Sequence, residues 1–241
     1  VGPPFYHKLI IPFLIPFLLI MAIGPKLKWI KSNIENKIYL ILPLIISIML
    51  SILIVKNFSF KFLINTILIS SALYLFYITL RDFFSKGFKN LAQNIAHFGF
   101  SLLILSILFN NLFSTEIITN LKVGETFENT KAKIVFEGVS QKEEKNYKSI
   151  VAKFLIEDSK GKLENLSPEL RIYNQPNIAT SEADIKTTLL SDKFIVINIV
   201  QNQEFFNVRY QVKPFMLWIW ISVILISFGG LVSFIKKEYE K

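Results

Sequence analysis

Several polar side chains interrupt an apolar stretch, residues 91–113, that is long enough to cross a lipid bilayer. Gln93, His97 and Ser101 recur every four residues, so on an α-helix they lie along one face. Ala92, Ala96 and Gly99 form an adjacent face of small residues. Such a face lets another helix or a flat ligand approach closely. Because unsatisfied polar groups are costly in hydrocarbon, we expect the polar stripe to face a bundle interior or a cavity.

His97 has two possible uses in this position. Its imidazole could hydrogen-bond across a helix pair, or it could ligate a haem iron in its neutral form, with Gln93 or a backbone carbonyl setting the tautomer. The residue types leave both uses open. The chain's other histidine, His7, lies at the start of the first apolar stretch, which we expect at the outer membrane face, whereas His97 is expected near the inner face. The two histidines therefore cannot share one iron. We interpret His7 as an interfacial residue, and a second axial ligand would have to come from other polypeptide.

The elements that must position His97 are membrane-spanning helices. Hydrophobic residues make up 52% of the 241 residues and occur in long blocks, unlike those of soluble domains. A span needs about 20 mostly apolar residues, and five stretches meet this requirement: residues 8–24, 38–55, 60–80, 91–113 and 214–235. The sequence therefore predicts an integral membrane protein with about five helices. We also expect the chain, which begins with Val1, to be the later part of a longer polypeptide.

The net charge of +9 is explained by orientation in the membrane rather than by nucleic-acid binding. Residues 114–213 carry 14 basic and 14 acidic residues, so the excess lies around the helices. Most of it falls in two inter-helix links and the C-terminal tail: Lys26, Lys28, Lys31 and Lys37; Arg81, Lys86 and Lys89; Lys236, Lys237 and Lys241. The positive-inside rule then places these segments and the C-terminus in the cytoplasm. Residues 114–213 would lie outside.

The exported block reads as an all-β domain inserted between the fourth and fifth helices. Segments such as KAKIVFEGV, SIVAKFLIED and KFIVINIV are rich in β-branched residues, and ELRIYN and NVRYQV resemble them. EDSKGKLEN has the composition of a hairpin turn with Gly161 at positive φ. We expect six or seven strands in an antiparallel sandwich or partial barrel. The block has no histidine and no phosphate loop, so docking is a better expectation for it than catalysis.

Three predicted segments follow: a four-helix segment at 1–113, the β-rich domain at 114–213, and a final helix with a basic tail at 214–241. The last helix starts with Lys213, Pro214, Trp218 and Trp220, which is typical of an interfacial aromatic anchor. The adjacent Gly229 and Gly230 would allow close helix packing. The chain has no cysteine, which excludes disulfides and thiolate metal sites within it.

Several motifs in order resemble the CcmF family, the haem lyase subunit of system I cytochrome c maturation. They are VGPPFY and IGP around the first helix, NLAQNIAHFG, SPELRIY followed by TSEADI, and VKPFMLWIWISVILISFGGLVSF. The resemblance covers almost the whole chain but only the C-terminal portion of the family. The tryptophan-rich WWD segment, its flanking histidines and the preceding helices have no counterpart here.

The resemblance implies a bacterial inner-membrane protein that helps attach haem to the CXXCH motif of apocytochrome c in the periplasm. It implies a membrane b-type haem with His97 as one axial ligand, the other coming from the missing N-terminal portion. Gln93 and Ser101 would then be candidates to orient that histidine. The implied partners are a CcmE-type haem chaperone, CcmH- and CcmI-type subunits that handle apocytochrome, apocytochrome c, and membrane lipid, but no nucleic acid. The WWD segment would be needed for full enzyme activity.

Two other functions compete with this one. The chain could be a non-catalytic assembly or scaffold protein whose β-domain docks partners and whose His97 packs helices together. A transporter subunit is disfavoured because Asp82 and Glu35, the acidic residues near the helices, are both expected in inner loops rather than within spans.

Overall fold

The protein consists of two compact units, which we describe separately from a computed structural model. One unit comprises Val1–Leu112 together with Trp218–Lys241, and the other comprises Phe113–Leu217. The structure describes residues 3–26, 38–55, 62–86, 90–159, 161–199 and 204–239. Of the basic residues used above to predict orientation, Lys28, Lys31, Lys37, Lys89 and Lys241 lie outside these ranges, as does Glu35.

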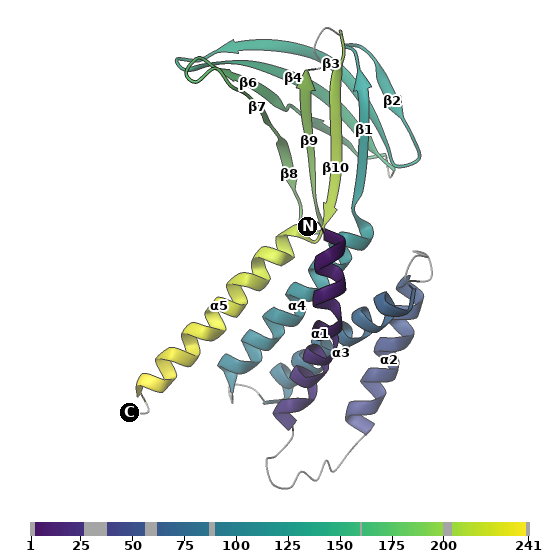
Figure 1. Ribbon diagram of the computed structural model, residues 1–241, viewed down its shortest axis with the longest axis vertical. Helices are drawn as coiled ribbons and strands as arrows, with labels where there is room; N and C mark the ends of the chain where they lie inside the picture. Colours follow the sequence, from purple (N-terminus) through teal and green to yellow (C-terminus); the bar gives the residue numbers. More distant parts are fainter. Residues whose placement is uncertain are drawn as a thin grey trace. The chain divides into compact units, whose positions relative to one another are not determined.

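Within the described ranges, five helices are long and apolar enough to cross a membrane (Figure 1). They are α1 (Pro3–Ile23), which continues into a short 3-10 turn η1 (Gly24–Lys26), α2 (Ile38–Val55), α3 (Phe62–Lys86), α4 (Leu91–Phe113) and α5 (Met216–Tyr239). Pro12 and Pro16 lie inside α1 without ending it. The predicted class, a multi-pass helical membrane protein with a β-domain between the fourth and fifth helices, is confirmed.

Helix α3 is the central helix of its unit and is longer than predicted. We expected it at residues 60–80, with Asp82 in a loop, but the helix runs to Lys86 and includes Asp82. The statement that no acid lies within a span was therefore wrong. About 56% of the α3 span is buried, against 11–22% for the spans of the other four helices. Residues of α1, α3 and α4 form the core, among them Leu18, Leu75 and Leu105.

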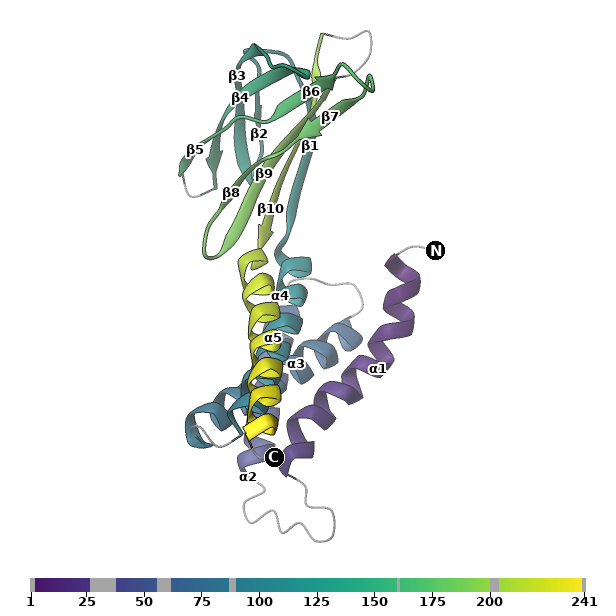
Figure 2. The same cartoon turned by 90° about the vertical axis from the view of Figure 1, so that its left-hand side faces the viewer.

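The β unit is an antiparallel sandwich of two sheets. One sheet has the strand order β1-β10-β9-β8, and the other has the order β2-β3-β4-β6-β7, with β5 paired to β4 (Figures 1 and 2). The described strands are β1 (Thr115–Leu121), β2 (Thr126–Glu128), β3 (Ala132–Glu143), β4 (Tyr147–Asp158), β5 (Leu163–Leu166), β6 (Glu169–Tyr173), β7 (Ala179–Glu182), β8 (Asp184–Thr187), β9 (Ser191–Ile199) and β10 (Phe206–Pro214).

The five quoted β segments all form strands, but the expected total of six or seven was too low, because ten strands are described. The additional ones include β2, β7 and β8, which are three or four residues long. Strands this short show no alternation that a sequence pattern can reveal. The predicted hairpin is confirmed, since β4 pairs with β5 and Gly161 between them has a φ of +75°.

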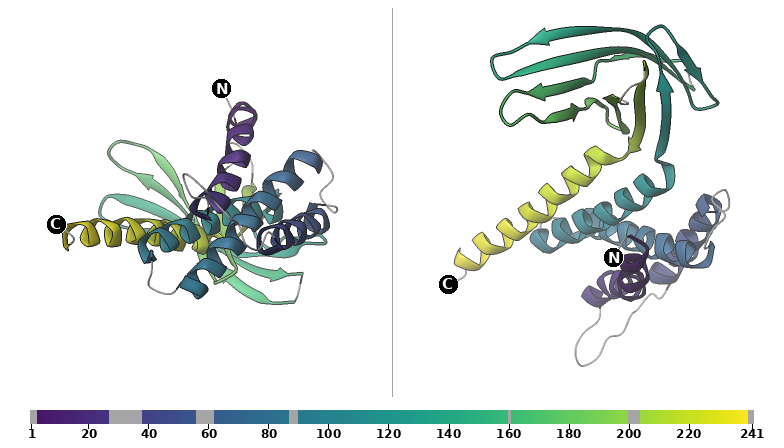
Figure 3. Two further views of the ribbon diagram at one scale, coloured as in Figure 1. Left: turned by 90° about the horizontal axis from the view of Figure 1, so that it is seen from below. Right: turned by 45° about the horizontal axis from the view of Figure 1, so that its top comes forward.

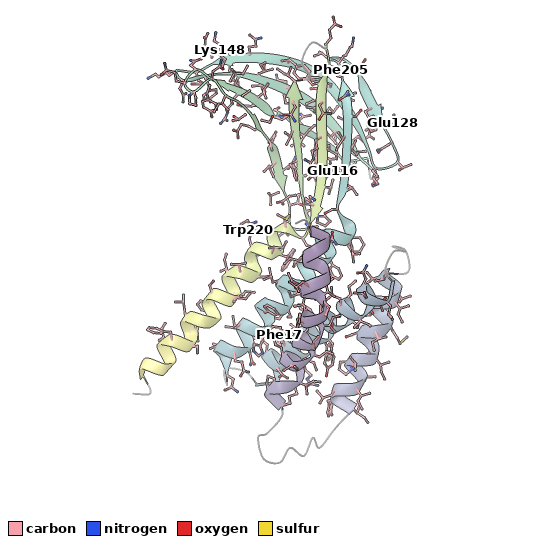
Figure 4. The ribbon with its side chains drawn as sticks, viewed as in Figure 1. Phe17, Glu116, Glu128, Lys148, Phe205 and Trp220 are labelled. Atoms are coloured by element: carbon pink, nitrogen blue, oxygen red, sulfur yellow. The ribbon has the colours of Figure 1, made fainter. Side chains whose placement is uncertain are left out.

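The order of strands places both chain connections to the helices at one end of the four-stranded sheet. β1 begins at Thr115, directly after α4, and β10 ends at Pro214, directly before α5. Thr115 is opposite Val212 in the pairing of β1 with β10. Glu116 marks this end of the sheet in Figure 4, and Phe205 marks the other. Inward side chains of both sheets fill the sandwich, with Phe136 stacked on Phe154 at 4.5 Å between ring centroids.

Candidate functional site

His97 lies half-buried on α4 and lines a small cavity of about 80 Å³ in the helical unit. The cavity lies between α1, α3 and α4, and its polar lining consists of Thr79, Asp82, Asn90, Gln93, Asn94 and His97. Gln93 and His97 therefore share one cavity, as the stripe predicted. The helical unit holds His97 among groups that can donate or accept hydrogen bonds.

Ser101 lies one turn further along α4 and contacts α3. Its hydroxyl donates to the carbonyl of Phe98 on its own helix at 2.8 Å. The same oxygen lies 3.3 Å from Oγ1 of Thr79, whose hydroxyl also bonds to carbonyls on α3. Ser101 is fully buried, so the third member of the stripe faces the bundle interior, as expected. Its described bonds join α4 to α3.

Asp82 is the charged residue in the wall of this cavity. The carboxylate is buried and lies 3.2 Å from Nζ of Lys26 and 3.6 Å from a guanidinium nitrogen of Arg81. Arg81 also donates to the backbone oxygen of Tyr39 at 3.0 Å, so these contacts connect η1, α2 and α3. Asp82 is thus a neutralised acid at the end of a span, next to the cavity that contains His97.

The small-residue face of α4 packs against α5. A Cβ atom at Gly229 would lie 2.8 Å from the backbone nitrogen of Ala96 and 2.9 Å from the carbonyl oxygen of Ala92. A Cβ atom at Gly99 would lie 3.0 Å from the backbone of Ile226. Figures 2 and 3 show α5 running beside α4. Close helix packing, one of the two uses predicted for this face, is present in the structure.

Beyond that contact, a groove of about 480 Å³ lies between the first turn of α4 and the last turns of α5. Gln93 lines both this groove and the cavity that contains His97. Its side chain is exposed. It is therefore placed to connect the two spaces.

The sandwich buries a charge pair that joins its two sheets. Lys193 of β9 lies 3.0 Å from Glu164 of β5 and 3.1 Å from Asp158 at the end of β4. Lys162 lies 2.9 Å from the other oxygen of Glu164. Burial acts to raise the pKa of Glu164, but the two ammonium groups outweigh it and hold that pKa below its usual value. The pKa of Lys193 is raised, because the bonds to Glu164 and Asp158 outweigh the effect of burial.

A cavity of about 460 Å³ lies beside this charge cluster and is lined by residues of both sheets. Lys193, Asp158 and Lys162 lie in its wall with Tyr210, whose pKa is raised by burial and by the charges of Glu164 and Asp158. The cations and carboxylates in this cluster neutralise one another. The arrangement therefore stabilises the contact between the two sheets.

Nothing in the described part of the chain resembles a complete metal site, because no three His, Cys, Asp or Glu side chains cluster there. His97 could supply a single ligand to a metal whose other ligands come from elsewhere, as the porphyrin nitrogens of a haem do. The side chain of His7 lies outside the described part, although its backbone belongs to α1.

Several of the groups around His97 and in the sandwich were not predicted from the sequence. Leu75, Ile78 and Asp82 are spaced i, i+3 and i+7, so continuing the helix by one turn would have placed Asp82 on the buried face. In β9, Lys193 alternates with Ile195 and Ile197, which puts its ammonium group on the inward face. Both spacings were visible in the sequence. They were not used because each would have placed a charged side chain among buried apolar residues.

Both units of the chain are similar to the same group of known proteins. Residues 112–214 match the family model described as the CcmF C-terminal beta-sandwich. The whole chain is 28% identical to the cytochrome c-type biogenesis protein CcmF of Haemophilus influenzae, of which it covers 40%. It is 26% identical to the protein of the same name from Escherichia coli, covering 39%, and 25% identical to that from Pseudomonas fluorescens, covering 38%.

A solved structure named Cytochrome c Heme Lyase CcmF has the same fold. It matches 95% of this chain with a TM-score of 0.71 and 20% identity, and the match covers 40% of that structure's chain. The chain thus spans about two fifths of the length of the relatives it matches. It is a homologue of the CcmF cytochrome c-type biogenesis proteins and corresponds to their C-terminal part.

Proposed function

We propose that the chain forms the C-terminal part of a haem lyase subunit, and that the complete protein supports covalent attachment of haem to the CXXCH motif of apocytochrome c. The observation that carries this proposal is the extent of the likeness. It covers all of the chain, helices as well as sandwich, in relatives named for cytochrome c-type biogenesis. The folded likeness is to a protein named as a cytochrome c haem lyase.

His97 is the proposed axial ligand of a b-type haem in the membrane. A histidine imidazole on an inward helix face is a common axial ligand of haem iron in proteins. When bound, such a haem supplies one-electron redox chemistry. Gln93, in the same cavity, is the proposed partner that sets the imidazole's tautomer. Ser101 acts less directly in this proposal, by fixing α4 against α3 through Thr79.

The space beside His97 bears on where such a haem would lie. Pockets for ligands of drug size typically measure about 300–1,000 Å³, whereas the cavity at His97 measures about 80 Å³. The described residues therefore fit the role of one ligand but do not enclose a macrocycle. Polypeptide from the N-terminal portion is expected to supply the second axial ligand and the remaining walls.

The proposed setting is a bacterial inner membrane, with the sandwich in the periplasm and the C-terminus in the cytoplasm. The basic residues in two inter-helix links and the C-terminal tail support this orientation. The partners proposed for the sandwich are a CcmE-type haem chaperone, CcmH- and CcmI-type subunits and apocytochrome c. The absence of cysteine from the chain is compatible with this, because the thiols that form the thioether bonds belong to the apocytochrome.

A non-catalytic assembly protein is the competing proposal. In both proposals the sandwich is a docking unit, and its equal numbers of basic and acidic residues are compatible with that role. The two proposals differ in what they require of His97. A scaffold uses it only for packing, so cytochrome c maturation should survive its replacement.

The test uses the chain together with the polypeptide that its source encodes as the N-terminal portion. Both are produced in cells lacking their own maturation protein, with a CXXCH-containing reporter. His97→Ala is expected to lower the haem content and change the reduced-minus-oxidised spectrum of the purified protein, and to abolish covalent haem on the reporter. His7→Ala is the matched control and should leave both unchanged.

Each outcome separates the two proposals. Unchanged haem stoichiometry and spectrum in His97→Ala would reject the ligand role. Loss of haem with full maturation of the reporter would favour the scaffold. Added imidazole should restore the spectrum of His97→Ala if the variant is folded and lacks only the ligand.

A further inference from the structure

The turn between β8 and β9 presents two adjacent leucines to the surroundings of the sandwich. Leu189 is 70% exposed and Leu190 is 68% exposed. The turn is closed by hydrogen bonds between Thr188 and Ser191, from the backbone nitrogen of Thr188 to the carbonyl of Ser191 at 3.0 Å and from the nitrogen of Ser191 to Oγ1 of Thr188 at 3.1 Å. Turn positions usually carry polar residues or glycine, so two large apolar side chains that are mostly exposed at this tip are unusual.

Strand pairing places this turn beside the start of α5. Ser191 is opposite Pro214 in the pairing of β9 with β10. The next residue, Phe215, donates its backbone N–H to the carbonyl oxygen of Leu190 at 2.9 Å. Phe215 immediately precedes the apolar span Met216–Ile235. The turn is therefore hydrogen-bonded to the residue at which the chain enters the membrane.

The other chain connection lies at the same end of the sheet. The apolar span of α4 ends at Phe113, and β1 begins two residues later at Thr115, opposite Val212. Two crossing points and the turn therefore share one end of the four-stranded sheet. The strands beside the turn appear in Figure 2, where β8 and β9 meet at its tip.

The length of the α5 span sets the depth of the turn. Its 20 residues extend about 30 Å at 1.5 Å per residue, which matches the hydrocarbon thickness of a typical bilayer. Met216 then lies at the hydrocarbon boundary. The headgroup layer beyond it is roughly 5–7 Å thick, so a residue hydrogen-bonded to Phe215 lies within that layer.

We propose that the turn Thr188–Ser191 is a membrane-surface anchor, with Leu189 and Leu190 inserted at the boundary between lipid headgroups and acyl chains. The partner is the bilayer itself, on the face where the sandwich lies. Together with the two chain crossings, the turn gives the sandwich a third point of attachment to the membrane.

The absence of cysteine from the chain makes the test direct, because a single introduced cysteine is a unique labelling site. Leu189→Cys and Leu190→Cys are each labelled with bimane in this 241-residue chain, reconstituted in phosphatidylcholine vesicles. Nitroxide groups are carried by lipids at the headgroup or at a shallow acyl position. Val123→Cys is the matched control: it is 52% exposed and lies past the other end of β1, roughly 20 Å away along the strand.

Bimane at positions 189 and 190 should lose most of its fluorescence to both nitroxide lipids, while bimane at position 123 should lose none. Quenching at positions 189 and 190 by aqueous iodide, but not by lipid nitroxides, would show that the turn faces water and would overturn the proposal. Resistance to both quenchers would show that other polypeptide covers the leucines, and would overturn it equally. The result does not depend on haem, so it is independent of the proposed function.

Discussion

The two units bury polar side chains by different means. In the helical unit, buried hydroxyls donate to carbonyl oxygens three or four residues earlier on their own helix, as Ser71, Ser101 and Ser222 do. In the sandwich, the buried Lys193 and Glu164 find their partners across the layer between the sheets. An α-helix offers a carbonyl within reach of a short side chain. A strand uses its carbonyls in the ladder, so an inward polar group depends on the opposite sheet.

The units also differ in how their elements approach one another. Helices α4 and α5 make backbone contact at Gly229 and Ala96, where a glycine removes the obstacle. The sheets are held apart by inward side chains, so their contact is made by side-chain packing and by the charge pair. Substitutions that remove a buried partner should therefore damage the sandwich most, and those that add volume should damage the helical pair.

The largest effect is expected from Lys193→Met, which leaves Glu164 buried with only Lys162 beside it. Breaking a buried ion pair costs about 3–5 kcal/mol, and we expect the lower end of this range because Lys162 remains. The measurement is the rate at which a thiol reagent modifies Ala152→Cys, a fully buried reporter in β4, as denaturant is added. Lys162→Met is the control: that side chain is 58% exposed, and its loss should cost less than about 1 kcal/mol.

The same charge pair should make the sandwich's stability depend on pH at both extremes. The folded pKa of Glu164 is depressed, so its contribution is present above the ordinary carboxyl value of about 4.3 and is lost as pH falls through the folded value. The folded pKa of Lys193 is raised, so its contribution is present below about 10.4 and is lost as pH rises through the folded value. Both changes should be weaker in Lys193→Met; an identical pH profile in that variant would contradict this assignment.

An intermediate effect is expected from Gly229→Ala in the helical unit. The new Cβ would lie 2.8 Å from the backbone nitrogen of Ala96, so α4 and α5 must move apart. Overpacking of this kind costs about 1–3 kcal/mol, measured by thiol modification of Ala72→Cys in α3, which is fully buried. Gly230→Ala is the control, because a Cβ there meets nothing within 4 Å and should stabilise the helix by up to about 1 kcal/mol. Equal effects of the two substitutions would reject the close contact.

The smallest effect is expected from Ser101→Ala. The hydroxyl bonds to Phe98 and contacts Thr79 across α3 and α4. Interhelical hydrogen bonds in membranes contribute about 0.6 kcal/mol on average, so this loss should be far smaller than that of Lys193. The Ala72→Cys reporter measures it, with Ser222→Ala as a control whose described hydroxyl bond remains within α5. A cost above that of Gly229→Ala would show that Ser101 has a role beyond joining the helices.

Particular residues show how far sequence reasoning extends. The alternation in KFIVINIV and the turn at Gly161 identified β9 and the β4–β5 hairpin, because backbone geometry and local composition determine both. The end of α3 was placed too early, since a charged residue at position 82 resembles the edge of a span. In the fold its charge is neutralised by Lys26, which is 56 positions away in the sequence. A hydropathy pattern describes only neighbouring residues, so it cannot reveal an ion-pair partner that is this far away in the sequence.

The stripe of Gln93, His97 and Ser101 illustrates the same division within one helix. Its helical spacing alone predicted that the three side chains share a face, and the bilayer's intolerance of polar groups predicted that the face is turned inward. The groups that contact that face could not be predicted, because Thr79 and Asp82 belong to α3 and the packing of α3 against α4 is not encoded in a local pattern.

The sequence by itself determined the five spans, the inserted β-domain and the inward face of α4. These depend on local periodicity and on the length that a bilayer imposes. Only the tertiary structure decided that Asp82 lines the cavity with His97, that Glu164 and Lys193 join the sheets, and that Leu190 is bonded to the residue before α5. Each of these depends on contacts between distant segments, whose partners are chosen by packing and hydrogen bonding rather than by any local pattern.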